Sequence, residues 1–428
     1  MEINKCLFLL FSPLFLIGQN VNPFICGHEY VLDINEKSYP GYKAAIQKTF
    51  EAAYKNIDDQ HSRNDIFSIP VIIHIVWKNN EENLHDSIIQ TQLNMLNESF
   101  RLQNSNRDDV RDIFKAVQAD ASIEFRLHEV KRLKTNTSFA LSLSGLPDKV
   151  KQTSQGGSDA SDPDKFLNIW VCKIQPIPII GGQILGYAYP PVGLDNWPAG
   201  STAPSKNLEG LVIDFRVFGS NNPNKLTVNG LTHNALGRTT VHETGHYLGL
   251  RHIWGDGGGI FGGSSCNADD GISDTPNQGA QSSGCDTLSN TCIDTLSGPD
   301  LPDMIENYMD YSAESCQNTF TKEQVNLMRV VLQNQRSQLV DARDILVAGS
   351  HVSILPNPAS KSIHVRPLPE FGEYKIEIRD LSAKVVYAQN NLSNNFELDI
   401  STFLNGFYLV SFISEHGVQS CKLIISHD

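Results

Sequence analysis

The spacing of apolar residues divides the chain into parts of different character. Between about residues 67 and 348, apolar runs rich in β-branched and aromatic residues predict strands, and apolar residues at helical spacing predict a helix at 87–101. A second helix is predicted around residue 242. The predicted strands of this part are 69–77, 123–130, 167–172, 184–189 and 210–218.

A different pattern follows Gly349 and Ser350. Short β-type runs are separated by turn residues at regular intervals, which is typical of a small all-β sandwich. We therefore expect a separate C-terminal domain over residues 351–428. Its predicted strands are 362–365, 374–380, 385–387, 407–414 and 421–425.

The first residues have the pattern of a secretory signal peptide. Lys5 supplies a positive charge, and a short apolar run covers residues 7–17. This run is too short to span a bilayer comfortably, so we predict a cleaved signal peptide over residues 1–18. A buried N-terminal strand is the alternative. No other segment has a transmembrane pattern, so no transmembrane segment is expected in the mature protein.

Length and charge narrow the class of protein. The chain has 428 residues, of which 40% are hydrophobic, and is long enough for more than one domain. Its formal net charge of -14 argues against nucleic-acid binding, which requires a basic surface. The same charge favours solubility and would suit calcium binding, although charge alone establishes neither.

The candidate chemistry is concentrated in a His-Glu-x-x-His pattern at His242, Glu243 and His246. Histidines four residues apart share one face of a helix and can hold one metal ion. Glu243 lies close enough to polarise a metal-bound water without being a ligand. Gly249 permits a sharp turn that returns His252 as a third ligand and leaves the fourth position for water. The short motif alone can arise by chance on a polar helix, but the positions of Gly249 and His252 at fixed distances after it favour a catalytic zinc site.

This extended motif resembles the signature of the metzincin metallopeptidases. Residues 210–328 resemble the pappalysin family of metzincins, in particular its cytophagalysin-like bacterial branch. The resemblance implies an α+β metzincin-type catalytic domain over residues 67–348, with a twisted five-stranded sheet, an active-site helix, and a Met-turn subdomain that ends in a helix at 322–343. The matching blocks are 210–218, the zinc helix, 274–276, 306–311 and 320–321, with weaker similarity at 69–76.

The resemblance also implies the roles of the site residues. Members of the family are zinc endopeptidases that hydrolyse peptide bonds in protein substrates through a zinc-activated water. Met309 fits the methionine beneath the metal and Tyr311 the tyrosine that stabilises the transition state, although a methionine between two tyrosines is otherwise ordinary core. The implied zinc ligands are His242, His246 and His252, and the implied general base and acid is Glu243.

A catalytically silent surface-binding protein that reuses the fold is the alternative to an enzyme. Such a protein would be expected to have lost Glu243 or a metal ligand. None of these residues is missing from this sequence, so the pattern favours the endopeptidase.

The polar, helix-prone segment 19–66 is a candidate pro-region, because a secreted peptidase must stay inactive until it is exported. Its clearest helical pattern lies at 42–55. Cys26 resembles in position the cysteine switch of some metzincin zymogens, in which a thiolate occupies the open metal position. The residues around Cys26 do not match a full switch motif, and a plain unpaired cysteine is the alternative.

Four further cysteines cluster after the zinc helix and indicate an oxidising compartment. Spacing alone permits three pairings, and the family resemblance implies Cys266–Cys292 and Cys285–Cys316. A second zinc site is the alternative, but no Cys-x-x-Cys spacing supports it. Cys172, inside an apolar run, is expected to be a buried free thiol.

The same segment carries Asp269, Asp270 and Asp274 among glycines. Clustered carboxylates can bind calcium, and the resemblance implies calcium near this region, whereas a solvated acidic loop is the alternative. In basic-selective members of the family, a carboxylate directly before the last loop cysteine makes the specificity pocket acidic. Here that position is Ser315, with Glu314 one residue earlier, so the sequence does not predict arginine specificity.

Residues 351–428 resemble the C-terminal sorting domain of proteins exported by the type IX secretion system of Bacteroidetes. The resemblance rests on the Pro-Asn-Pro opening, on 404–408 and on 422–425. It implies contact with that secretion machinery, passage across the inner and outer membranes, and a secreted or surface-attached enzyme. A carbohydrate- or protein-binding module is the alternative.

Overall fold

The computed structural model describes a large part of the chain. The predicted signal peptide and the helical pattern at 42–55 lie outside the described residues. Within the described ranges, no helix is long and apolar enough to cross a membrane. The described residues are 24–27, 37, 66–141, 146–177, 182–191, 203–255, 266–267, 269–294, 299–340, 352–355, 359–367, 372–380, 384–393, 396–414 and 417–427.

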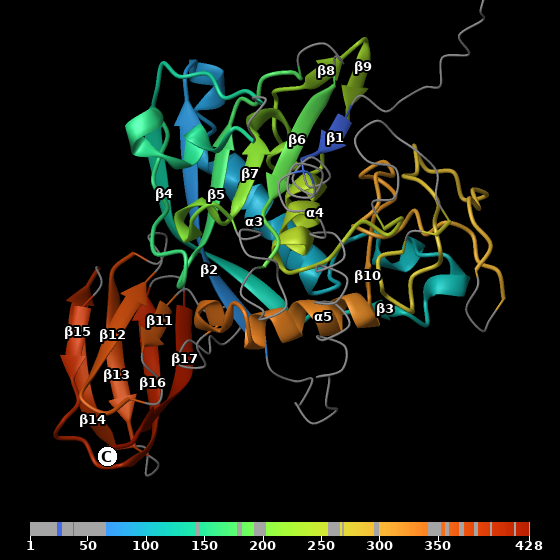
Figure 1. Ribbon diagram of the computed structural model, residues 1–428. Coiled ribbons are helices and arrows are strands. Elements are labelled where there is room, and N and C mark those ends of the chain that lie inside the picture. Colours follow the sequence, from blue (N-terminus) through green and yellow to red (C-terminus); the bar gives the residue numbers. More distant parts are fainter. Residues whose placement is uncertain are drawn as a thin grey trace, which may run out of the picture.

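A six-stranded sheet forms the centre of the first part of the molecule (Figure 1). In sheet order its strands are β1 (Phe24–Cys26), β6 (Gln183–Ala188), β7 (Leu211–Asp214), β5 (Leu167–Cys172), β2 (Phe67–Trp77) and β4 (Ile123–Lys134). Five of them correspond to the predicted strands, which confirms the α+β class. The sixth, β1, comes from the segment predicted as a pro-region. It pairs in parallel with β6, which is itself antiparallel to β7.

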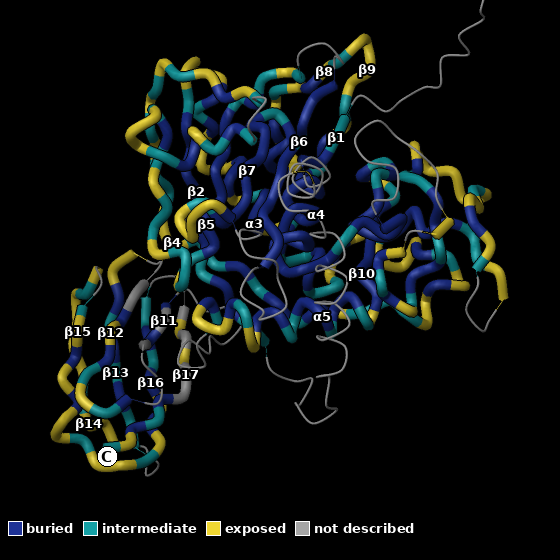
Figure 2. The backbone as a smooth tube through the Cα atoms, viewed as in Figure 1, coloured by how far each residue is buried: buried dark blue, intermediate teal, exposed yellow. Residues whose placement is uncertain are grey.

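Both faces of this sheet are covered by a hydrophobic core. Side chains alternate between the two faces along a strand. In β5, Ile169 and Val171 belong to the main core, whereas Trp170 and Cys172 belong to a smaller core on the opposite face. Figure 2 shows the central strands buried along their length. The helices α3 (Asp86–Phe100) and α4 (Arg238–Tyr247) pack on the main-core face, and α3 matches the helix predicted at 87–101. α4 lies against β6 and β7, directly beneath the edge to which β1 is added.

Shorter elements complete this part. β10 (Phe320–Thr321) pairs with β3 (Gln118–Ala119), and β8 (Leu226–Val228) forms a hairpin with β9 (Leu231–His233). 3₁₀ helices occupy Asn80–Glu82, Arg107–Asp109, Asp112–Phe114, Asp148–Lys151, Thr153–Gln155, Lys206–Leu208, Phe215–Val217 and Ser337–Val340.

The last helix of the catalytic part, α5 (Lys322–Gln333), begins at a capping box in which Thr321 and Gln324 bond reciprocally. The sequence predicted a helix over 322–343, and that prediction is wrong in length. After α5 the chain turns so that Arg336 becomes buried and its guanidinium reaches the Glu209 carboxylate and the backbone carbonyl of Tyr247. A continued helix would forgo these contacts.

The C-terminal part is a sandwich of two antiparallel sheets with its own core. One sheet contains β11 (Val352–Leu355), β12 (Ser362–Pro367) and β15 (Phe396–Asp399), and the other contains β14 (Val385–Leu392), β13 (Tyr374–Arg379), β16 (Gly406–Ser414) and β17 (Gly417–Ile425). All five predicted strands are present, and β11 and β15 are additional. Among the described residues, the sandwich core shares no member with the two cores around the first sheet.

Candidate metal centre and active site

The helix that carries the candidate ligands, α4, is buried along its whole length. It begins after Gly237, which adopts a left-handed φ of 87° and makes no side-chain cap. The Glu314 carboxylate takes the place of a cap, since it accepts hydrogen bonds from the backbone N–H groups of Arg238 and Thr239, each at 3.0 Å. A negative charge at the N-terminus of a helix also favours the helix dipole.

The end of α4 directs the third candidate ligand, His252, toward the other two histidines. Gly249 has a φ of 97°, a left-handed conformation that the sequence had predicted for it. The backbone N–H of Leu250 then donates to the carbonyl oxygen of Gly245 at 2.9 Å, which closes the turn. Beyond it, the buried ring of His252 stacks on Trp254, with 4.3 Å between the ring centroids.

His242, His246 and His252 converge on one point. Their Nε2 atoms lie 3.1 to 3.2 Å apart in all three pairs. Tetrahedral zinc with ordinary zinc–nitrogen bonds requires about 3.4 Å between ligand nitrogens, so the triangle is nearly the size that zinc needs.

The other ring nitrogens fix which nitrogen carries the proton. His242 Nδ1 donates to the carbonyl oxygen of Tyr308 at 2.7 Å, and His246 Nδ1 donates to that of Leu250 at 2.9 Å. The Nε2 lone pairs are therefore available to a metal, as is usual for metal-binding histidines. The donor set fits zinc.

Glu243 points into the same buried region. Both of its carboxylate oxygens are shielded from solvent and lack a hydrogen-bond partner among the described residues. Burial raises the pKa of Glu243 to about 8, opposed by a smaller effect of the Cys26 thiol. The close approach of α4 to β6 requires a glycine at 186, because a Cβ there would lie 3.0 Å from Glu243 Cγ.

Met309 is fully buried against the helix that carries two of the histidines. Its Sδ packs so closely on Gly245 of α4 that any side chain at 245 would collide with it. The backbone N–H of Met309 donates to Asn307 Oδ1 at 2.9 Å, which holds the turn. The role of Met309 as an apolar floor beneath a metal stays a prediction.

Cys26 and Tyr311 meet at the open side of the histidine triangle. The ligand atoms of Cys26, His242, His246 and His252 all lie within 4.8 Å of one another, and Cys26 is buried. The backbone N–H of Cys26 donates to the Tyr311 hydroxyl at 3.0 Å. Strand β1 thus brings one residue of the predicted pro-region to both the metal position and the tyrosine.

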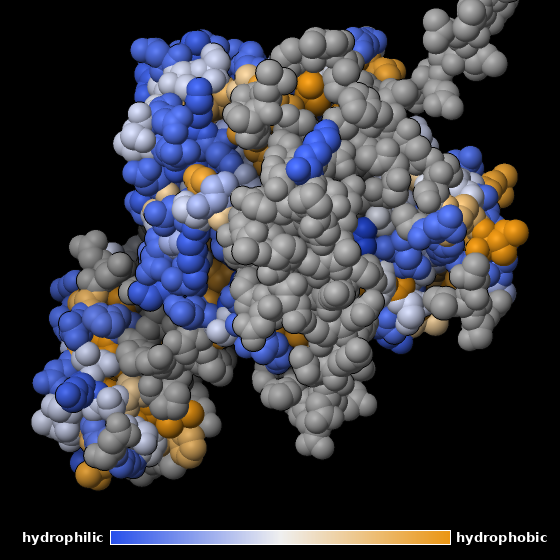
Figure 3. Space-filling model, viewed as in Figure 1, coloured by the Kyte–Doolittle hydropathy of each residue, from blue (hydrophilic) through white to orange (hydrophobic). Residues whose placement is uncertain are grey.

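The two predicted disulfides, Cys266–Cys292 and Cys285–Cys316, are confirmed. They hold together the segment drawn at the right of Figure 1, where Figure 3 shows orange apolar patches among hydrophilic residues. Leu288 and Ile293 are exposed in this segment. Cys172 is a buried thiol outside both disulfides, and burial raises its pKa well above the usual value.

The three acidic residues of this segment do not converge. Asp269 and Asp270 accept hydrogen bonds from the backbone N–H groups of Gly271 and Ile272, and Asp274 accepts from that of Glu323 in the first turn of α5. Within the described part of the chain, the cysteine–histidine group is the only set of three or more such side chains whose ligand atoms come together. The calcium site stays a prediction.

Glu314 and Ser315 were predicted at the specificity pocket. The Glu314 carboxylate is buried, and besides the N-terminus of α4 it contacts His233 Nε2 at 3.3 Å. Although burial raises the pKa of Glu314, hydrogen bonds from His233 and from the backbone outweigh it and lower the pKa to about 2. Ser315 is exposed beside the Cys285–Cys316 disulfide. The contacts of Glu314 with α4 have no signal in the sequence, since 75 residues separate Glu314 from Thr239.

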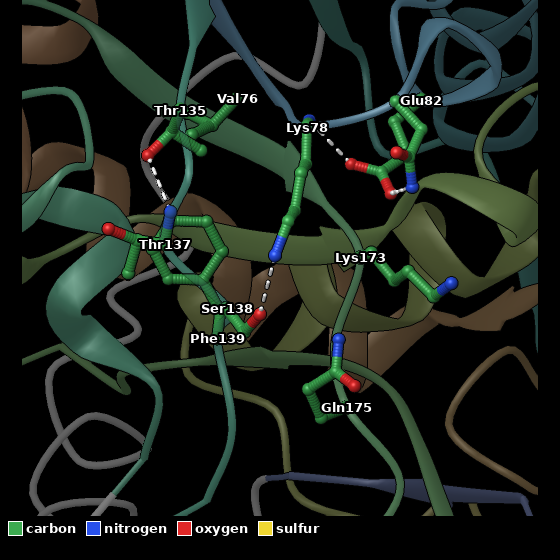
Figure 4. A pocket seen from close by; sticks show the side chains of 10 residues that line it. Val76, Lys78, Glu82, Thr135, Thr137, Ser138, Phe139, Lys173 and Gln175 are labelled. Carbon is green, nitrogen blue, oxygen red and sulfur yellow. Dashed lines mark hydrogen bonds between the residues drawn. The ribbon is translucent and has the colours of Figure 1, made fainter.

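A separate pocket of about 220 Å³ lies at the carboxyl ends of the parallel strands β2, β4 and β5 (Figure 4). In it, Lys78 Nζ reaches Ser138 Oγ at 3.4 Å and the buried Glu82 accepts from the Lys78 backbone N–H at 2.7 Å. None of the metal-site residues lines this pocket, so it is distinct from the catalytic cleft. Its walls are formed by Val76, Lys78, Asn79, Glu82, Thr135, Thr137, Ser138, Phe139, Lys173 and Gln175.

Known proteins resemble the two parts of the chain separately. A family model described as pregnancy-associated plasma protein-A matches residues 221–333, and a model of the secretion system C-terminal sorting domain matches residues 353–426. An extracellular metalloprotease of Pyricularia oryzae is 28% identical over 331 residues, which cover 76% of this chain and 95% of that protein. An extracellular metalloprotease of Trichophyton verrucosum is 28% identical over 289 residues, which cover 66% of this chain and 84% of that protein.

Two solved structures, of mirolysin and promirolysin, are also similar to this chain. Mature mirolysin of Tannerella forsythia, in complex with a cleaved peptide, is 33% identical with a TM-score of 0.54, covering 65% of this chain and 97% of that one. A promirolysin mutant of the same organism is 31% identical with a TM-score of 0.57, covering 74% and 96%.

The fold and the histidine cluster define a metalloendopeptidase of the metzincin type. The chain belongs to the pappalysin family of these enzymes. Together with the sorting domain at its C-terminus, this makes it a secreted or cell-surface metallopeptidase.

Proposed function

We propose that this enzyme is a zinc endopeptidase made as a zymogen, in which Cys26 blocks the metal until the N-terminal segment is removed. The observation that carries the proposal is the convergence of Cys26 with His242, His246 and His252 in one buried group. A thiolate is a strong zinc ligand, and it would occupy the position that a catalytic water needs.

Latency has two further supports besides the cysteine. β1 pairs with the edge of β6, and the backbone N–H of Gly27 donates to the carbonyl oxygen of Gly186 at 2.7 Å. The hydroxyl of Tyr311 is engaged by the backbone of Cys26. The segment would therefore occupy the metal position, the strand edge and the tyrosine at once.

Removal of this segment would free the edge of β6 for a substrate. An extended peptide can add to a sheet edge by backbone hydrogen bonds, largely independent of its sequence. A peptide at this edge would pass over Glu243 and the histidines, since α4 packs directly against β6. This placement favours extended protein segments as substrates.

When bound, zinc would supply the Lewis acidity that activates a water and polarises the scissile carbonyl. Glu243 is placed to accept the proton of the attacking water and to pass it to the leaving amine, and its raised pKa suits a group that both accepts and donates near neutral pH. Tyr311, freed from Cys26, would donate a hydrogen bond from its hydroxyl to the oxyanion. Met309 would keep the floor of the site apolar.

The sequence boundaries complete the proposal. We assign residues 1–18 to a signal peptide, 19–66 to the pro-region, 67–348 to the catalytic domain and 351–428 to the sorting domain. The last would engage the type IX secretion machinery. A calcium ion near Asp269, Asp270 and Asp274 would stabilise the disulfide-bonded segment.

The test is proteolysis of casein by the processed enzyme, with zinc measured in the same samples. Glu243→Ala should abolish cleavage and retain zinc, because Glu243 is not a ligand. Glu129→Ala, an exposed carboxylate on β4, is the matched control and should retain activity. Stoichiometric zinc without cleavage in the wild type would instead support the catalytically silent binding protein.

A further inference from the structure

Phe24, two positions before Cys26, contacts a part of the cleft next to the histidine cluster. Phe24 and Cys26 lie on the same short strand, so their Cα atoms are separated by at most about 7 Å. The ring of Phe24 lies 5.1 Å from the ring of His233, with the planes inclined by 59°. Figure 1 shows β1 beside the β8–β9 hairpin that ends with this histidine.

His233 is held in place by the cap of the catalytic helix. Its Nε2 contacts Glu314 Oε1, and the same carboxylate accepts from the N-terminus of α4 and from Thr239 Oγ1 at 2.8 Å. The position of His233 is thereby tied to the helix that carries two of the metal ligands.

The carboxylate of Glu314 is not available to a ligand in the cleft. It is 5% exposed, and its lowered pKa keeps it ionised, but backbone N–H groups and His233 surround both oxygens. A substrate at this point would therefore meet the imidazole ring of His233 rather than a free negative charge. Aromatic and large aliphatic side chains favour such a surface.

We propose that His233 lines the side-chain subsite next to the metal position, and that this subsite selects an aromatic or large aliphatic residue of the substrate. In the latent enzyme Phe24 occupies the subsite. The inference rests on the proposed function, since it assumes that substrates bind along the β6 edge that β1 now covers. It makes His233 a specificity-determining residue.

The first experiment is a cleavage profile of the processed enzyme on a peptide library. We expect Phe, Tyr, Leu or Met to be enriched at one position adjacent to the cleaved bond. A dominant preference for Arg or Lys there would overturn the proposal, because it would require an accessible carboxylate.

The second experiment uses matched peptides with Phe, Ala or Arg at the enriched position. For the wild type, kcat/KM should favour Phe over Ala by about tenfold or more. His233→Ala should remove most of this preference, and His233→Phe should retain it, because an aromatic wall remains. His128→Ala is the control, since that histidine contacts Phe166 elsewhere and should leave the ratio unchanged. Because a ratio is compared, partial unfolding of a variant does not affect the result.

A third readout uses synthetic peptides with the sequence of residues 22–28 as inhibitors. Replacing Phe24 by Ala in the peptide should weaken inhibition of the wild type, and the same replacement should matter little against His233→Ala. Equal losses against both enzymes would show that the two rings do not interact and would overturn the proposal.

Zinc content and casein cleavage, measured on the same samples, separate the two proposals. An enzyme that cleaves casein with another preference disproves the subsite and leaves the endopeptidase intact. A zinc-loaded enzyme that cleaves nothing disproves both.

Discussion

The helix α4 and the core of the C-terminal sandwich are both buried, but they consist of different kinds of residue. In α4 most buried side chains are polar, among them His242, Glu243 and His246. In β13 of the sandwich the buried positions alternate along the strand and carry Tyr374 and Ile376, with Ile378 completing the row. Apolar burial is stabilising wherever the pattern is kept, whereas a buried polar group needs a specific partner.

Most partners of α4 come from distant parts of the chain, and Leu250 is the near one. Tyr308 and Leu250 accept from the histidine rings, Glu314 caps the helix, and β1 closes the site from the N-terminal side. Changes around α4 should therefore alter the chemistry of the site. Changes in the sandwich, whose core is separate, should alter only the folding of the sandwich.

Removal of one ligand is the most severe way to test this difference. His252→Ala leaves two imidazoles, which are too few to retain catalytic zinc. We expect no measurable peptidase activity and zinc below stoichiometric amounts, determined by metal analysis after dialysis. His364→Ala, an exposed histidine of the sandwich, is the control and should leave zinc and activity unchanged. Stoichiometric zinc in the His252 variant would mean that another residue completes the site.

Tyr311→Phe tests a contribution to catalysis that leaves the metal in place. The variant keeps the ring packed between His252 and Trp254 and removes only the hydroxyl. Loss of one donor to an oxyanion lowers kcat by about 100-fold or more, or about 2.7 kcal/mol. The KM for a peptide substrate should change little. A variant with unaltered kcat would assign the oxyanion to other donors.

Cys26→Ser in the full chain tests the predicted switch. A serine hydroxyl is a far weaker zinc ligand than a thiolate, but β1 would still pair with β6. We expect the peptidase activity of the unprocessed chain to rise at least about tenfold. This corresponds to a loss of about 1.4 kcal/mol in the free energy with which the segment blocks the site. The processed enzymes should be indistinguishable, since both lack residue 26. Cys172→Ser is unsuitable as a control because that thiol is fully buried. Ser154→Ala, at an exposed serine of the 3₁₀ helix Thr153–Gln155, serves instead.

The cap at Glu314 gives a pH-dependent effect on stability. Its pKa in the folded protein is about 2, below the value of an unfolded glutamate near 4.3, so the carboxylate contributes stability above pH 4.3 that is lost as the pH falls toward 2. The shift corresponds to about 3 kcal/mol.

Glu314→Gln should therefore lower the free energy of unfolding at pH 6 by an amount of that order, with a difference from wild type that shrinks toward pH 3. Denaturant unfolding at the two pH values measures it. Glu377→Gln in the sandwich, which makes only surface ion pairs, should show no comparable change. A difference independent of pH would assign the effect of Glu314 to packing.

The same contrast explains what could be predicted from sequence. Five strands of the central sheet and five of the sandwich followed from apolar periodicity. The fixed spacing of His242, His246 and His252 marked them as candidate ligands because they are close in sequence. The contact of Glu314 with α4 and the ring contact between Phe24 and His233 had no such signal. Each joins residues whose approach depends on the completed fold. The length of α5 was mispredicted for the same reason, since Arg336 finds its partners only in the tertiary structure.

A core substitution in the sandwich should have the smallest effect on catalysis. Ile376 is fully buried between the two sheets, and truncation of such a residue to alanine costs about 2–5 kcal/mol. Because the sandwich core shares no described residue with the catalytic cores, this loss should lower only the unfolding transition of the sandwich. The kcat/KM of the processed enzyme should stay within about twofold, which is under 0.5 kcal/mol. Ile73→Ala in β2, the equivalent truncation in the main core, should by contrast lower the transition to which activity is coupled. If both substitutions reduced activity alike, the sandwich would be part of the catalytic folding unit, and the separation inferred from the two cores would not hold.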